Sequence, residues 1–114
     1  MMTLDDLRAM GVRVDEGLAR CLDNEEFYLK MVDKCLNDSN FEELGRTLDA
    51  GDLDQAFEYA HAIKGVVSNL ALTPLQDEIA GFIEPLRART RMDYSEMYAS
   101  LIRTRDEFIG TITD

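Results

Sequence analysis

Apolar residues recur every three or four positions along nearly the whole chain, whereas no segment shows the alternation of apolar and polar residues that marks a half-buried strand. The pattern therefore predicts helices throughout. The first two are short, over 3–10 and 15–22. Thr3 can accept hydrogen bonds from the free amides of the first helix, and Gly11 suits its end.

Longer helices are predicted in the rest of the chain. Asn24 is a good N-cap for a helix over 24–36, whose apolar positions share one face. A polar turn over 37–40 precedes another helix, over 41–50, which Gly51 is expected to end. The apolar positions of these two helices are Tyr28, Met31, Val32, Cys35, Phe41, Leu44 and Leu48.

The most regular helix is predicted over 52–72. Its apolar residues step by three and four positions, which is typical of a stripe that faces other helices. The stripe consists of Leu53, Ala56, Ala60, Ile63, Val67 and Leu70. Residues away from this stripe are expected to face solvent.

A further helix is predicted over 74–86, with Thr73 as its N-cap and Pro74 at its first position. Pro85 is expected to kink or end it, because proline removes one backbone donor and clashes one turn back. Its apolar stripe comprises Leu75, Ile79, Phe82 and Leu86.

The last helix follows an arginine-containing segment, 87–93, which is interpreted as a solvated bend. Asp93 and Glu96 resemble a capping box at its start. Its apolar positions are Met97, Leu101, Phe108 and Ile112.

These elements predict an all-α protein, an antiparallel four-helix bundle with short additional N-terminal helices. The chain is interpreted as a single domain over 1–114, in which 1–22 form the accessory helices and 24–112 the bundle. Cys21 and Cys35 are expected to be free thiols, since a small disulfide framework usually uses more cysteines. A regulatory bond between them is the less favoured alternative.

Composition narrows the possible partners. The 114 residues include 12 Lys and Arg against 23 Asp and Glu, a formal charge of −11, while 46% are hydrophobic and can supply a core. This charge disfavours nucleic acids and anionic membrane surfaces as partners. No apolar run exceeds three residues, and the first ten residues lack the pattern of a secretory signal. We therefore expect a cytoplasmic protein that does not enter a membrane.

His61 is the one histidine of the chain, and it lies in the middle of the most regular helix. At about 100° per residue, it points roughly 130° away from the centre of the apolar stripe. Lys64 shares its face, and Gly65, one turn further on, points outward. Glycine in an exposed helix costs about 1 kcal/mol relative to alanine. A physical use for it is to leave space in which another surface can approach His61.

A neutral imidazole with a nearby ammonium and no steric cover is suited to accept a phosphoryl group. A metal site is not expected, because His61 has no second histidine or cysteine ligand nearby. Each of these residues also has a structural interpretation. His61 would be an ordinary surface residue, and Lys64 a solvated cation near Glu58 or Asp77. Gly65 would relieve a close crossing with a neighbouring helix.

The segment Ala60-His61-Ala62-Ile63-Lys64-Gly65, followed by Ser68-Asn69-Leu70, resembles the signature of histidine-containing phosphotransfer (HPt) domains of two-component phosphorelays. The stretch 11–20 is similar to one often seen in stand-alone members. The resemblance implies that His61 accepts a phosphoryl group from an aspartyl phosphate on one receiver domain and relays it to another. It further implies that Lys64 supports the phosphoryl group and that Gly65 leaves room for the partner.

The partners implied are the receiver domains of a hybrid histidine kinase and of a response regulator. The resemblance places the Mg²⁺ on the receiver, so this chain is expected to need no cofactor or metal of its own. A monomer is expected because nothing in the sequence demands a dimer. The chain would be a phosphotransfer intermediate without kinase activity. The expected partner-docking residues are Phe57, Ser68, Asn69 and Gln76, with Tyr59 and Val66 as further apolar candidates.

Two positions depart from the family pattern. Ala71 stands where the family usually has a glycine after the Asn-Leu pair. Ile83 stands where many members have a Gln or Glu that hydrogen-bonds the imidazole, and the nearest polar alternatives are Glu84 and Gln76. The partner of the second imidazole nitrogen is therefore left open.

Two other functions compete with the relay. One is a helical interaction module that docks receiver or other protein domains without being phosphorylated. The other is a hydrolytic enzyme that uses His61 as a general base, but no nucleophile or orienting carboxylate is visible for it.

Overall fold

The computed structural model describes residues 2–113, with side chains as far as Thr111. Within this range the chain is helical, and no strand occurs among the residues described. The helices are α1 (Leu4–Ala9), α2 (Val14–Arg20), α3 (Glu25–Leu36), α4 (Asn40–Asp49), α5 (Leu53–Asn69), α6 (Thr73–Arg87) and α7 (Ser95–Thr113). The predicted all-α class is confirmed.

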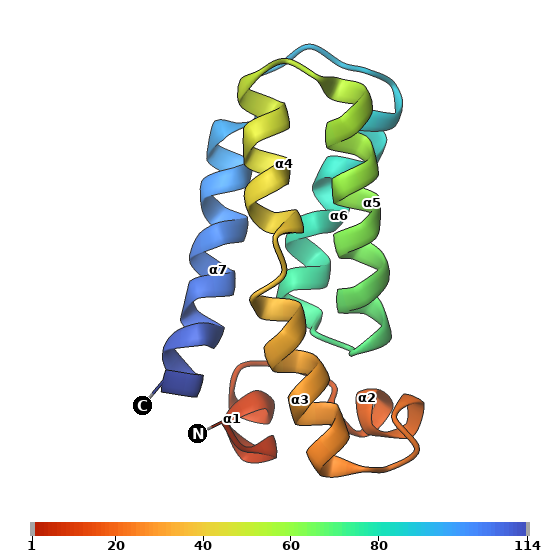
Figure 1. The fold of residues 1–114 in the computed structure, drawn as a ribbon, viewed down its shortest axis with the longest axis vertical. Coiled ribbons are helices and arrows are strands. Elements are labelled where there is room, and N and C mark those ends of the chain that lie inside the picture. The colour runs from red at the N-terminus through yellow and green to blue at the C-terminus, as the bar shows by residue number, and fades with distance from the viewer. Residues whose placement is uncertain (1, 114) are drawn as a thin grey trace.

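The long helices form an antiparallel bundle (Figure 1). α4 and α6 run in one direction, and α5 and α7 run in the other. α5 packs against α4 and α6, while α7 packs against α6 and α3. α3 continues the line of α4 at its lower end, so these two helices share one corner of the bundle (Figure 1). The predicted four-helix bundle is confirmed, with one of its corners broken into two helices.

The predicted apolar stripes form the core. All four stripe positions of α6 are fully buried, and so are those of α5 apart from a half-buried Leu53. Leu101 and Phe108 of α7 are also fully buried, whereas Ile112 lies outside the described side chains. The bundle therefore forms because each helix has one apolar face to remove from water.

Several predicted helix ends are also confirmed. Thr3 and Asp6 make a reciprocal capping box at α1, and the Asn24 side chain accepts from the amide of Phe27 in α3. Gly11 and Gly51 adopt φ angles of 93° and 72°, which glycine tolerates without a Cβ clash.

Two details at the ends of α6 and α7 differ from the prediction. Leu72, not Thr73, is the N-cap of α6; Thr73 is already helical, and its hydroxyl donates to the Ala71 carbonyl. Asp93 accepts from the Ser95 amide at 2.9 Å, so it does not form a capping box with Glu96. The prediction that α6 ends close to Pro85 agrees with the structure, in which the helix ends at Arg87.

The helix continues past Pro85 to Arg87. A proline so near the C-terminal end removes only one intrahelical donor, and the turn is completed by the amide of Thr90, which donates to the Pro85 carbonyl at 2.9 Å.

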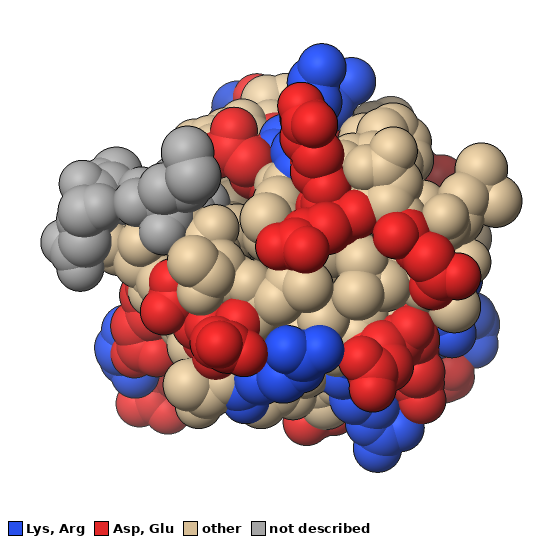
Figure 2. Space-filling model, turned by 90° about the horizontal axis from the view of Figure 1, so that it is seen from below, with Lys and Arg blue, Asp and Glu red and all other residues tan. Residues whose placement is uncertain are grey.

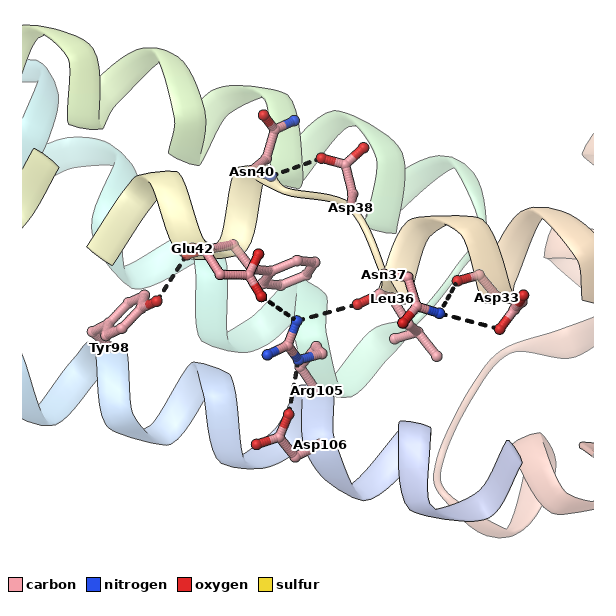
Figure 3. Close-up of polar contacts among 10 residues, drawn as sticks. Asp33, Leu36, Asn37, Asp38, Asn40, Glu42, Tyr98, Arg105 and Asp106 are labelled. Carbon is pink, nitrogen blue, oxygen red and sulfur yellow. Dashed lines mark hydrogen bonds and ion pairs between the residues drawn. The ribbon is translucent and has the colours of Figure 1, made fainter. Parts of the chain in front are cut away.

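Arg105 of α7 holds the break between α3 and α4 (Figure 3). Its Nη1 donates to the Leu36 carbonyl and to Glu42, both at 3.3 Å, while its Nε donates to Asp106 at 2.9 Å. Its guanidinium lies over the Phe41 ring, 5.3 Å from the centroid. These contacts satisfy a carbonyl that the end of α3 would otherwise leave free.

A second contact joins α7 to α4 close to this break. The Tyr98 hydroxyl donates to the Phe41 carbonyl at 2.9 Å (Figure 3). The Tyr98 ring occupies the space next to Gly45, where an added Cβ would lie 2.5 Å from its Cζ and Oη atoms. Gly45 therefore permits this close approach of the two helices.

The accessory helices cover the C-terminal end of α5. The amide of Arg13 donates to the Ala71 carbonyl at 3.2 Å, and Arg20 Nη1 donates to the Ser68 carbonyl at 2.7 Å. The Tyr28 hydroxyl of α3 donates to the Leu70 carbonyl at 2.8 Å. Carbonyls at the end of α5 and in the turn that follows it thus find partners in the first 28 residues.

Acidic residues occupy the first turns of α1, α2 and α3, where carboxylates favour the positive end of the helix dipole. Seen from the end that these helices form, carboxylates cover much of the surface, with basic groups between them (Figure 2). None of the described helices is both long and apolar enough to cross a membrane.

Candidate functional site

The candidate site lies on the solvent side of α5. Phe57, His61, Lys64 and Ser68 follow one another at steps of four, three and four, so they share a stripe beside the buried one. His61 and Lys64 are exposed, whereas Phe57 and Ser68 are half-buried. The prediction that His61 stands outside the core is confirmed.

Lys64 lies one turn from His61 and is exposed. Among the side chains that the structure describes, it forms no ion pair, with Glu58, Asp77 or any other carboxylate. Its ammonium is therefore available to an anion placed near the imidazole.

Gly65 faces open space. A Cβ added there would meet nothing within 4 Å, in contrast to Gly17 and Gly45, where it would clash. The alternative that Gly65 relieves a tight helix crossing is therefore wrong. The neighbouring Val66 keeps 41% of its surface exposed, so the surface beyond His61 is partly apolar.

The imidazole of His61 lies against the ring of Phe57, one turn earlier in α5. The ring centroids are 5.8 Å apart and the planes differ by 14°. No side chain in the described part of the chain hydrogen-bonds the imidazole. Glu84 instead pairs with Arg87, and Ile83 is buried. Neither of the polar alternatives, Glu84 and Gln76, thus replaces the hydrogen-bonding residue of the family pattern.

The arginine-containing segment 87–93, which begins with the last residue of α6, does more than form a solvated bend. The guanidinium carbons of Arg87 and Arg89 lie 5.7 and 5.3 Å from the centroid of the Phe57 ring. Arg89 Nε also donates to Asp54 Oδ1 at 2.5 Å. Sequence spacing could not reveal this contact, because it depends on how the end of α6 aligns with the first turns of α5.

The other docking candidates lie towards the C-terminal end of α5 and the start of α6. Asn69 is exposed, and Ser68 and Gln76 are half-buried. The carbonyls of Ser68 and Asn69 both accept from Arg20 of α2, at 2.7 and 3.3 Å. The accessory helices therefore hold the backbone at this end of the stripe.

The cysteines take no part in this site. Cys21 and Cys35 are both buried and free. Burial raises the pKa of Cys35 to about 12, which keeps the thiol protonated and unreactive at neutral pH. The described side chains contain no group of three His, Cys, Asp or Glu residues that could hold a metal ion.

Fold and site together define a helical bundle that presents one accessible imidazole, beside which lie an uncovered glycine and an ammonium that pairs with none of the described carboxylates. The Hpt domain family model matches residues 31–107. The chain therefore belongs to the Hpt domain family, whose members take part in phosphotransfer in two-component signalling and interact with receiver domains. No curated protein and no solved structure matched the chain.

Proposed function

We propose that this protein is a phosphocarrier, which accepts a phosphoryl group on His61 from the aspartyl phosphate of one receiver domain and passes it to a second receiver. The observation that carries the proposal is the exposed imidazole of His61 beside the open surface at Gly65 and beside Lys64, which no carboxylate in the described range pairs with. The donor would belong to a hybrid histidine kinase and the acceptor to a response regulator, both in the cytoplasm.

In the transfer step, an imidazole nitrogen attacks phosphorus while the bond between phosphorus and the aspartyl oxygen breaks. The electron pair of that bond leaves with the aspartate carboxylate. Lys64 would offset the negative charge on the phosphoryl oxygens, and the catalytic Mg²⁺ would belong to the receiver. The reaction then depends mostly on positioning and charge stabilisation.

The docking surface in this proposal surrounds His61 on α5. It would extend over Ser68 and Asn69 to Gln76 at the start of α6, with Phe57 at its other end. Val66 would supply apolar area at its centre. Encounters between signalling proteins are often transient, so a surface of modest area is sufficient.

A phosphotransfer assay tests whether His61 accepts a phosphoryl group. The protein is mixed with a phosphorylated receiver and Mg²⁺, and the product is examined for an acid-labile, base-stable phosphoryl adduct. We expect the adduct on the wild type and none on His61→Gln, because only the imidazole provides the accepting nitrogen. Binding of the receiver without an adduct on the wild type would favour the non-phosphorylated interaction module instead.

Lys64→Ala should slow the transfer by up to about fivefold without unfolding the bundle, since an exposed charge pair is worth up to about 1 kcal/mol. Single-turnover kinetics measure the effect. Lys30→Ala, which removes an exposed lysine from α3, is the matched control. Equal rates for the two variants would remove Lys64 from the proposed site.

Gly65→Glu should block the approach of the receiver while leaving the helix content unchanged. Gly110→Glu is the matched control, because an added Cβ also meets nothing within 4 Å at that position of α7. Binding to the receiver and circular dichroism report the two effects. Transfer to Gly65→Glu at the wild-type rate would contradict the role of Gly65 as clearance.

A further inference from the structure

The orientation of the His61 ring rests on Phe57. The two rings are stacked at 5.8 Å with nearly parallel planes, and the described side chains offer the imidazole no hydrogen bond. An exposed side chain without a hydrogen bond is otherwise free to exchange rotamers rapidly. The stack with Phe57 is therefore the contact that restricts the plane of the imidazole.

Phe57 is itself held in place by the end of α6. Its ring is half-buried, and the guanidinium groups of Arg87 and Arg89 lie within 6 Å of its centroid, in the range of cation–π contacts. These contacts leave Phe57 little freedom to turn away from His61.

The side chain of Arg89 is itself held by two hydrogen bonds. Its Nε donates to Asp54 at 2.5 Å, and its Nη1 donates to the Leu86 carbonyl at 2.5 Å. Its backbone adopts φ 55°, in the left-handed region that few side chains favour. A chain of contacts thus runs from Asp54 through Arg89 and Phe57 to His61.

We infer that Phe57 is a positioning residue for phosphoryl transfer, one that acts by holding the imidazole plane of His61 in the orientation needed for attack. This inference rests on the proposed function. The lone pair of an imidazole nitrogen lies in the plane of the ring, so it reaches phosphorus in line only when that plane points towards the donor. Fixing the plane before the encounter reduces the orientational cost of the reaction.

Proton NMR tests the positioning directly, because His61 is the one histidine and its ring signals are unambiguous. Stacking on a phenyl ring shifts the imidazole protons upfield. Phe57→Leu should abolish this shift, whereas Phe57→Tyr, which keeps the aromatic ring, should preserve it. Phe27→Leu, at an exposed phenylalanine of α3, is the control for the type of substitution.

Kinetics with two donors separate positioning from docking. We expect Phe57→Leu to slow phosphorylation of His61 about tenfold, both by a phosphorylated receiver and by phosphoramidate, a small donor that needs no docking surface. In the second reaction, the N–P bond to imidazole forms as ammonia leaves the phosphoramidate. Phe57→Tyr should restore most of the rate with both donors.

Two other results would overturn the inference. A loss confined to the receiver would make Phe57 a docking residue only, and an unchanged ring-proton shift would show that the stack does not orient the imidazole. Failure of the wild type to accept from any receiver would contradict the proposed function, while phosphoramidate would still test the positioning.

Arg89→Gln provides a second variant if Phe57→Leu does not fold. It leaves both rings in place but removes one of the two guanidinium groups next to Phe57, the one that is bound to Asp54. It should reduce the upfield shift and the phosphoramidate rate together, and wild-type values of both would refute the role of this chain of contacts.

Discussion

Leu22 combines an unfavourable backbone conformation with a side chain that gains nothing from burial. Its φ angle is 58°, that of the next residue, Asp23, is 56°, and 91% of the Leu22 surface is exposed. A left-handed conformation costs an ordinary residue roughly 1–2 kcal/mol. The turn between α2 and α3 therefore retains a strain that packing at Leu22 does not offset.

Leu22→Asn should raise the free energy of unfolding by about 0.5–1 kcal/mol, because asparagine tolerates the left-handed region better than leucine. Urea denaturation measures the change. Met92→Asn is the matched control: Met92 is also an exposed apolar residue, 47% accessible, but its φ is not positive. An equal gain at both positions would show that removing exposed apolar surface, and not backbone strain, explains the effect.

At Ala71, which has a similar φ of 57°, burial of the side chain offsets the backbone strain. This is the position where the family usually has glycine, which would avoid the strain. The alanine side chain is only 2% exposed, so its methyl group gains about 0.8 kcal/mol from burial, which offsets much of that cost. The departure from the family pattern therefore leaves the turn between α5 and α6 intact.

At the scale of the elements, two helical glycines serve opposite purposes. Gly45 in α4 is buried and allows Tyr98 of α7 to approach, whereas Gly65 in α5 is exposed and touches no neighbouring element. Packing explains the first glycine. Nothing in the packing explains the second, which is what a surface kept open for a partner would require.

Alanine substitutions should therefore have effects of opposite sign. Gly45→Ala should lower the free energy of unfolding by about 1–3 kcal/mol, because Tyr98 must move and its bond to the Phe41 carbonyl is strained. Gly65→Ala should raise it by up to about 1 kcal/mol, since alanine favours the helix and meets no atom. Thermal unfolding of both variants checks the contrast, and destabilisation by Gly65→Ala would contradict the open space at that position.

At the scale of the whole molecule, the accessory helices and the bundle form one structure. α2 and the start of α3 enclose the end of α5: a Cβ on Gly17 would lie 2.7 Å from the Leu70 carbonyl and 2.5 Å from the Tyr28 ring. The family match begins only at residue 31. The preceding segment nevertheless supplies hydrogen bonds that the bundle needs.

Two buried ionisable residues, Cys35 and Tyr28, should make the free energy of unfolding fall at alkaline pH. Burial raises the pKa of Cys35 from 9.0 to about 12, so between these values the folded protein keeps a proton that the unfolded chain has released. Stability is thus unaffected below pH about 9 and falls as the pH rises through this window, by about 1.4 kcal/mol per pH unit. Tyr28, whose pKa burial raises from 10.0 to about 12, adds to the fall at its upper end.

Urea denaturation at pH about 8 and about 10.5 measures this loss. Cys35→Ala should lose less stability between the two pH values than the wild type, whatever its packing cost at the lower pH. Identical losses would show that the Cys35 thiol is not the group responsible.

The local sequence was sufficient to predict the helices, their buried stripes and the exposure of His61, because helical periodicity and the preferences of capping residues act over a few neighbouring positions. It also identified Lys64 and Gly65, which lie within one turn of His61. The errors at Thr73 and Asp93 arose where a turn is shaped by the elements it joins.

Only the tertiary structure showed the side-chain contacts between different helices. The contacts of Arg87 and Arg89 with Phe57, of Arg105 with the break between α3 and α4, and of Arg20 with the end of α5 join residues far apart in the chain. Such contacts depend on the alignment of packed helices, which periodicity does not encode. The exposure of His61 thus follows from the periodicity of its own helix, whereas the contacts of the arginines with Phe57, the ring next to it, follow from the packing of α6 against α5.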